Sequence, residues 1–129
     1  DDYKVFVMNG KSVLTLVCTG RTANAHYEDC YDMDWNLIEG CDMGEERSGR
    51  TIPKPACFDE MITAAESLAM PFNHARVDFY IVGGKLIFGE TTFTSGSGFD
   101  RFHPYEFDFE LGSKLVLPAT RPSGASNER

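Results

Sequence analysis

The sequence predicts an α+β domain, in which an antiparallel β-sheet of hairpins carries a helix packed on one face. Three observations lead to this fold class. Apolar runs flank a tight-turn signal in residues 4–18, and a second pair of strand-like runs flanks a glycine pair in residues 75–93. Between them, residues 57–70 carry apolar side chains at helical spacing.

The first hairpin has the clearest turn. Asn9-Gly10 separates a strand over residues 4–8 from a return strand over residues 12–18. This dipeptide favours a two-residue turn because both positions tolerate positive φ. Residues 31–38 then alternate polar and apolar side chains, which predicts a third strand. The Gly-, Glu- and Arg-rich stretch that follows predicts a loop.

The helix is expected over residues 57–70, where the apolar positions form one continuous face. Asp59 and Glu60 fall in its first turn, where the helix dipole favours negative charge. Pro71 lacks the backbone donor that a continuing helix needs, so the helix should end before it. A short second helix is expected over residues 104–113.

Composition restricts the partners and the compartment. The 129 residues include 12 Lys and Arg against 20 Asp and Glu, for a formal net charge of −8. Such an acidic surface repels nucleic acid and anionic membrane, so no nucleic-acid partner is expected. There is no apolar run long enough to span a membrane and no signal-peptide pattern, so we expect a cytoplasmic protein.

The spacing of the cysteines and histidines in the sequence indicates neither a metal site nor a catalytic nucleophile. The four Cys lack the close pairs of a zinc ribbon, and without a secretory signal they are interpreted as reduced thiols. No Cys is placed beside a His in a pattern that indicates an activated nucleophile. The three His are scattered and are interpreted as surface or capping residues.

The second hairpin carries the most informative polar residues. With a two-residue turn, Asp78 lies opposite Gly89, and Glu90 points to the other face of the sheet. A three-residue turn, or a bulge with the same effect, places Asp78 opposite Glu90 and Arg76 opposite Thr92. We predict this second register. Two neighbouring carboxylates repel each other, and a divalent cation such as Mg²⁺, which binds carboxylates and phosphates together, relieves the repulsion.

Several separated motifs then resemble a known family. The helix, the Arg-Val-Asp-Phe strand, the glycine turn and the strand beginning the run ETTFTSGSGF resemble the C-terminal half of the ATP-grasp fold. There the last strand ends in Glu-x-Asn-x-x-Pro-Gly. The motifs DYKVFVMNGK, YDMDW and IPKP are similar to those of the TupA-like (teichuronopeptide-biosynthesis-like) ATP-grasp family. The resemblance covers residues 1–118, and the polar residues 119–129 are expected to form a disordered tail.

The resemblance assigns roles to individual residues. It implies that Asp78 and Glu90 bind Mg²⁺ against the phosphates of ATP and that Arg76 contacts the transferred phosphate. Thr92 stands where the wider superfamily has Asn as a third metal ligand, which leaves the number of metal ions open, and Ser95 stands where it has Pro. The nucleotide-binding positions implied by the resemblance are Lys4, Thr94, Gly96 and Ser97.

The family resemblance also implies a reaction. ATP would activate a carboxylate, on a small molecule or a saccharide, as an acyl phosphate, and an amine would then attack to form an amide in bacterial surface-polysaccharide synthesis. ATP-grasp enzymes enclose ATP between two subdomains, so an N-terminal subdomain before residue 1 or a homo-oligomer partner is expected to complete the site. As an isolated fragment, this chain is expected to be inactive.

Two other function classes fit the sequence. The chain is also compatible with a binding module that recognises a saccharide or a protein without chemistry. A metal-dependent glycosyltransferase is the other alternative, because such enzymes often hold their metal with an Asp-x-Asp pair, and Asp32-Met33-Asp34 matches that short pattern.

Overall fold

The structure is a computed structural model that describes residues 1–41 and 43–93. Its elements are β1 (Asp2–Met8), β2 (Lys11–Thr19), β3 (Tyr27–Tyr31), α1 (Phe58–Ala69), β4 (His74–Val82) and β5 (Lys85–Thr92). The expected 104–113 helix and the expected 119–129 tail lie outside the described residues.

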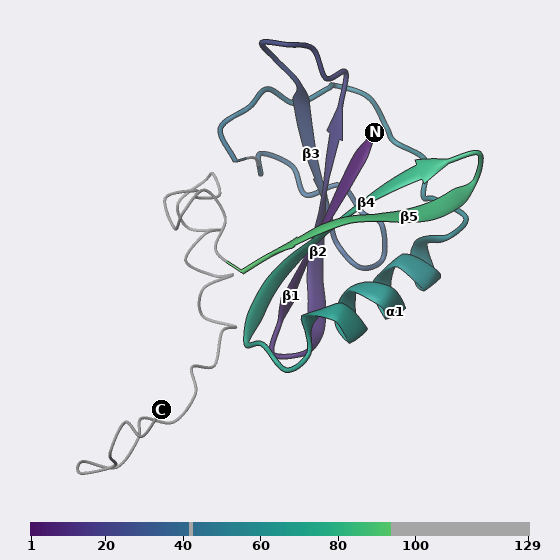
Figure 1. Ribbon diagram of the computed structural model, residues 1–129. Helices are drawn as coiled ribbons and strands as arrows, with labels where there is room; N and C mark the ends of the chain where they lie inside the picture. Colours follow the sequence, from purple (N-terminus) through teal and green to yellow (C-terminus); the bar gives the residue numbers. More distant parts are fainter. Residues whose placement is uncertain (42, 94–129) are drawn as a thin grey trace, which may run out of the picture.

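The strands form one antiparallel five-stranded sheet in the order β3-β2-β1-β4-β5. Helix α1 lies across one face of it (Figure 1). The predicted α+β class and both predicted hairpins are therefore confirmed. Strand β1 lies beside β4, so the first hairpin and the second share one sheet.

The two faces of the sheet have separate cores. On the helix side, α1 buries Phe58, Met61, Ala65 and Ala69 against β1 and β4. On the opposite side a smaller apolar cluster forms around Leu14 and Leu16 of β2, covered in part by the chain that follows β3. Because side chains alternate along a strand, the polar residues between the helix-side positions of β1 and β4 all emerge on this second face.

Helix α1 agrees with the sequence expectation. It runs from Phe58 to Ala69, with Asp59 and Glu60 in its first turn, and it ends before Pro71. The spacing of its buried residues shows why the apolar face was readable from sequence: each lies three or four positions from the next, on one side of the helix.

The predicted strand over residues 31–38 is wrong. The third strand is Tyr27–Tyr31, and the chain turns immediately after it. The Asp32 carboxylate accepts hydrogen bonds from the backbone N–H groups of Asp34 and Asn36, at 2.9 and 2.8 Å, and Trp35 adopts a positive φ of 62°. A side chain that bonds its own backbone in this way competes with a sheet ladder, so the alternation ends in a turn.

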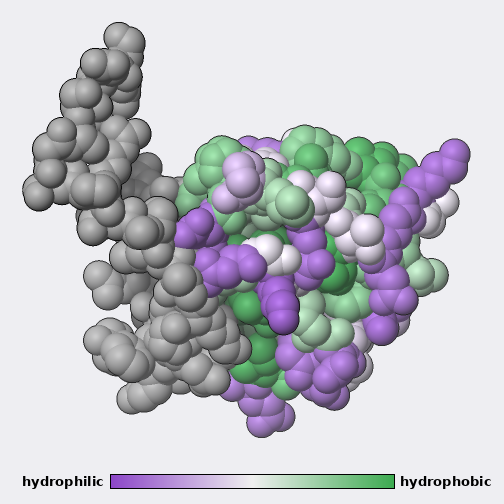
Figure 2. Space-filling model, turned by 90° about the horizontal axis from the view of Figure 1, so that it is seen from below, coloured by the Kyte–Doolittle hydropathy of each residue, from purple (hydrophilic) through white to green (hydrophobic). Residues whose placement is uncertain are grey.

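The surface of the described residues carries apolar as well as hydrophilic side chains. Seen from below, apolar side chains are exposed between hydrophilic ones (Figure 2). The exposed large apolar residues include Leu68, Met70 and Phe72 near the end of α1, and Ile87 and Phe88 on the edge strand β5. Among the described residues, no helix has the length and apolar character needed to cross a membrane.

Candidate functional site

The hairpin of β4 and β5 has the register that the sequence predicts, and a bulge produces it. Val82 pairs with Lys85 around a two-residue turn, so the three-residue turn is not used. The register then shifts between Asp78 and Phe79, and Asp78 lies opposite Glu90 while Arg76 lies opposite Thr92. Gly89 is the additional residue that makes this shift.

Gly89 also leaves room for the close packing at the bulge. A Cβ atom added there would lie 2.8 Å from the Tyr80 ring and 3.1 Å from the backbone oxygen of Asp78. Any other residue would therefore have to displace one of these neighbours. The absence of a side chain at Gly89 lets Asp78 and Glu90 emerge on the same face.

Strand β1 adds further charged groups to the site. Lys4 is the register partner of Asp78 on the side away from β5, and its Nζ lies 2.9 Å from Asp78 Oδ2. Lys4 also makes an ion pair of 2.9 Å with Asp2. Burial lowers the pKa of Lys4, but its hydrogen bonds to Asp78 and Asp2 outweigh this effect, so its pKa is raised above the ordinary value. Lys4 therefore carries a positive charge at neutral pH.

Arg76 is the counter-ion of both hairpin carboxylates. Its guanidinium donates to both oxygens of Asp78, from Nε to Oδ1 at 2.8 Å and from Nη2 to Oδ2 at 3.0 Å. The same Nη2 lies 3.6 Å from Glu90 and 3.4 Å from the Thr92 hydroxyl. Asp78 is buried, whereas the Glu90 side chain is 67% exposed. Arg76 thus stands close to both carboxylates.

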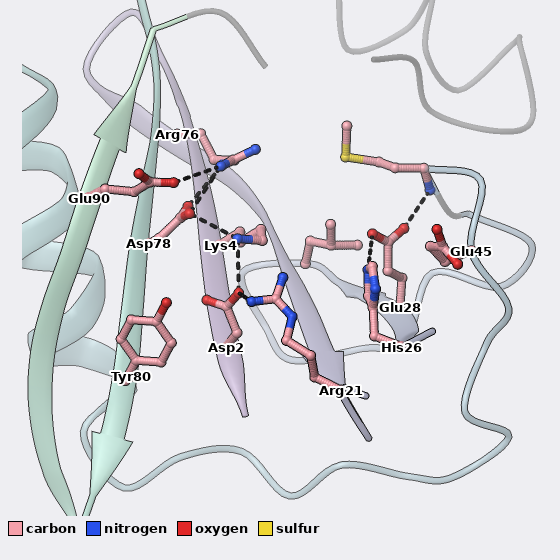
Figure 3. A pocket seen from close by; sticks show the side chains of 12 residues that line it. Asp2, Lys4, Arg21, His26, Glu28, Glu45, Arg76, Asp78, Tyr80 and Glu90 are labelled. Atoms are coloured by element: carbon pink, nitrogen blue, oxygen red, sulfur yellow. Dashed lines mark hydrogen bonds and ion pairs between the residues drawn. The ribbon is translucent and has the colours of Figure 1, made fainter. Parts of the chain in front are cut away.

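These residues line an open pocket of about 390 Å³ on the face opposite the helix. That volume is in the range of small-molecule sites. Figure 3 shows Glu90, Asp78, Arg76 and Lys4 together on one side. His26, Glu28 and Glu45 lie on the other side, with Arg21 and Asp2 between the two groups.

The second side of the pocket was not found from the sequence. Arg21, His26 and Glu28 belong to the loop after β2 and to β3, a strand that the sequence pattern placed elsewhere. Glu28 pairs with Cys18 across β2 and β3, so an unrecognised strand register brings a thiol and an imidazole close together. Strand β3 spans five residues and is buried at four consecutive positions, so its sequence lacks the polar–apolar alternation that would have revealed it.

The Cys18 thiol is not suited to act as a nucleophile. Its side chain is buried, and burial raises the pKa of the thiol to about 12. At neutral pH it is protonated, and it therefore lacks the charge that reactive cysteines need. The four cysteines are free thiols, as the sequence predicted.

The hairpin residues fit a magnesium ion by their chemistry. Asp78 and Glu90 offer carboxylate oxygens from register partners on one face, the ligand type that Mg²⁺ prefers. Lys4 and Arg76 donate three hydrogen bonds to the two oxygens of Asp78, and a carboxylate has about four acceptor positions, so these contacts of the described residues leave capacity for a further partner.

The remaining predicted site residues are not placed. Thr94, Gly96 and Ser97 lie outside the described residues, so their nucleotide contacts stay predictions.

The Asp-x-Asp pattern gains no support from the geometry, because the Asp32 carboxylate accepts hydrogen bonds from its own turn and from the Asn36 side-chain amide.

The sheet carries one helix on one face and, on the other, two register-paired carboxylates with two largely buried cations. This arrangement is consistent with an ATP-grasp domain. The model of the family described as TupA-like ATPgrasp matches residues 1–116, and the chain therefore belongs to that family. No curated protein and no solved structure matches the chain significantly. The family resemblance inferred from the sequence is confirmed.

Proposed function

We propose that the open face of the sheet binds the magnesium ion and the phosphates of ATP in a carboxylate–amine ligase of bacterial surface-polysaccharide synthesis, in the cytoplasm. The family match supports an ATP-grasp ligase-related domain. The single observation that carries the finer proposal is the bulged register of β4 and β5, which pairs Asp78 with Glu90 and Arg76 with Thr92. A hairpin without Gly89 as its extra residue would separate the two carboxylates.

In this proposal Asp78 and Glu90 would hold Mg²⁺, with the Thr92 hydroxyl beside them. Bound there, Mg²⁺ would neutralise phosphate charge during phosphoryl transfer. Arg76 and Lys4 would bind and orient the phosphate oxygens, because a guanidinium fork and an ammonium are the usual partners of phosphate. The reaction would form an acyl phosphate from a carboxylate substrate and then an amide from an amine.

Lys4 and Arg76 would meet the phosphates of an anionic substrate in a pocket whose lining carries five carboxylates and three basic side chains, so Mg²⁺ would be needed to offset the excess negative charge. Lys4 and Arg76 are largely buried, with side chains 13% and 12% exposed, so their charges act with little screening by water. The surrounding residues fix both cations before any ligand arrives. Such fixed charges stabilise developing negative charge without reorganisation during the reaction.

Isothermal titration calorimetry with Mg²⁺ and a non-hydrolysable ATP analogue tests the proposal. The 129-residue chain and the full-length product of its gene are titrated side by side, each with Glu90→Gln as the site variant. We expect magnesium-dependent binding of the analogue by the full-length product and its loss in Glu90→Gln. If the full-length product binds no nucleotide, the carboxylate pair is structural and the non-catalytic binding module replaces the ligase.

A further inference from the structure

The side of the pocket opposite the hairpin carries three groups of the kind that bind transition metals. These are the thiol of Cys18, the imidazole of His26 and the carboxylate of Glu28, whose ligand atoms all lie within 4.8 Å of one another. His26 Nε2 and Glu28 Oε1 are 3.1 Å apart. None of the three takes part in the proposed nucleotide site.

The strand register accounts for their convergence. Cys18 on β2 is the direct partner of Glu28 on β3, and directly opposed side chains share a face of the sheet. His26 lies just before β3, two positions before Glu28, and its imidazole contacts the Glu28 carboxylate. Figure 3 shows His26 and Glu28 pointing toward each other.

We propose that Cys18, His26 and Glu28 form a zinc site, separate from the magnesium site of the hairpin. Thiolate, imidazole and carboxylate are the ligands that Zn²⁺ takes, and sites with three protein ligands keep a fourth position for water or substrate. Zinc–ligand bonds of about 2.0–2.3 Å put the ligand atoms of a tetrahedral ion about 3.4–3.7 Å apart. Ligand atoms already within 4.8 Å reach that geometry by shifts of about 1 Å or less.

Backbone groups that follow β3 in the chain hold the Glu28 carboxylate in place. The Met43 N–H donates a hydrogen bond of 3.1 Å to Glu28 Oε2, which leaves Oε1 directed at His26. The Glu28 N–H in turn donates to the backbone oxygen of Glu46 at 2.9 Å. Outer hydrogen bonds of this kind orient metal ligands and limit the entropy lost on binding.

Asp2 contributes a negative charge beside the cluster, and Lys4 and Arg21 pair with its Oδ2 at 2.9 and 3.8 Å. Asp2 is the register partner of Cys18 on the side away from Glu28, and it is 95% buried, with a relative exposure of 5%. Its Oδ1 accepts no hydrogen bond from the described residues. A buried carboxylate oxygen without a partner is costly, and a cation bound by the neighbouring thiolate reduces that cost. Binding Zn²⁺ releases the thiol proton of Cys18 to solvent.

The fourth coordination position of the zinc ion determines which class of substrate this site would bind. His26 and Glu28 line the same pocket as Asp78 and Glu90. An oxygen ligand of an anionic substrate, such as a carboxylate, would fill the fourth position of the zinc ion from that pocket. Cys18 is not among the residues that line the pocket, and its buried side chain is inaccessible to substrate.

Cobalt substitution tests the proposal in the 129-residue chain. Co²⁺ bound to a thiolate gives an intense near-ultraviolet charge-transfer band, and Zn²⁺ affinity is measured by competition with a chromogenic chelator. We expect one Co²⁺ per chain with that band, no band in Cys18→Ser, and zinc affinity at least about 100-fold weaker in His26→Gln. The His26 side chain is 23% exposed, so His26→Gln should fold normally.

Two control variants separate this site from other thiols. Cys57→Ser, at a partly exposed thiol outside the cluster, should keep the full cobalt band. Cys41→Ser interrupts the pair formed with Cys30, whose sulfurs lie 2.8 Å apart, and should also keep it. The proposal is overturned if the unmodified chain gives no thiolate band at stoichiometric Co²⁺. It is equally overturned if the band survives Cys18→Ser or is lost in Cys41→Ser.

Discussion

Replacing Asp78 by Asn removes the central negative charge of the site while keeping its shape. Asp78 is 2% exposed and accepts hydrogen bonds from Lys4 and from both nitrogens of the Arg76 fork. Removing one partner from a buried ionic network costs about 3–5 kcal/mol, because the remaining charges stay buried without compensation. Lys4 keeps its pair with Asp2, and Arg76 keeps Glu90, so we expect about 3 kcal/mol, the lower end of this range.

The matched control is Glu90→Gln. Glu90 carries the same charge, and its register partner is Asp78, but its side chain is 67% exposed and its pair with Arg76 is long, at 3.6 Å. Exposed ion pairs contribute little, so we expect a change within about 0.5 kcal/mol. If both carboxylates bind Mg²⁺, both variants lose magnesium-dependent nucleotide binding, whereas only Asp78→Asn loses stability.

Urea unfolding followed by circular dichroism measures the two free energies. For a chain of this size, about 3 kcal/mol corresponds to a melting temperature lower by roughly 10–15 °C. Equal destabilisation by the two variants would refute the reasoning, because it would mean that burial does not distinguish the two carboxylates. If the Asp78→Asn protein is as stable as the parent, the ion pairs of Asp78 with Lys4 and Arg76 do not contribute to the free energy of unfolding.

Three further variants test other parts of the structure. Gly89→Ala should weaken magnesium-dependent nucleotide binding in calorimetry, since its Cβ would meet the Tyr80 ring and the Asp78 backbone oxygen; unchanged binding would show that the bulge tolerates a side chain. Burial raises the pKa of the folded Cys18 thiol to about 12, whereas the unfolded thiol loses its proton near pH 9.0. The free energy of unfolding should therefore fall by up to about 1.4 kcal/mol per pH unit as the pH rises between these two values. Cys18→Ala should remove that component of the slope in urea titrations, and an identical slope would contradict the shift. Met61→Ala should cost about 2–5 kcal/mol in the same assay because Met61 is fully buried, and a loss below 1 kcal/mol would show that α1 packs loosely.

The hairpin of β4 and β5 was predictable because two requirements agree there. Val77 and Phe79 must face the core, and the sequence then leaves Asp78 on the opposite face. Glu90 reaches that face only if one residue is extra, and Gly89 is the residue that a bulge accepts with least strain. The local pattern therefore contained both the register and the polar face.

The position of Lys4 needed more than local pattern. Its contact with Asp78 exists because β1 lies between β2 and β4, a pairing across more than 70 residues of chain. Spacing within the sequence carries no signal for such a neighbour, and only the family resemblance indicated Lys4. The same limit explains why Cys18 and His26 were interpreted as unrelated, since their convergence depends on β3, which starts earlier than the alternation suggested.

The charges of the hairpin also determine when a metal ion can bind. Arg76 pairs with both Asp78 and Glu90, and Lys4 pairs with Asp78, so two positive charges already offset the two carboxylates. A divalent cation arriving alone would therefore meet two fixed positive groups as well as two carboxylates, and the gain in free energy would be small. Phosphates change this balance, because Lys4 and Arg76 gain new anionic partners while the carboxylates remain available to the cation. The arrangement therefore couples metal binding to nucleotide binding, and by linkage each should strengthen the other equally.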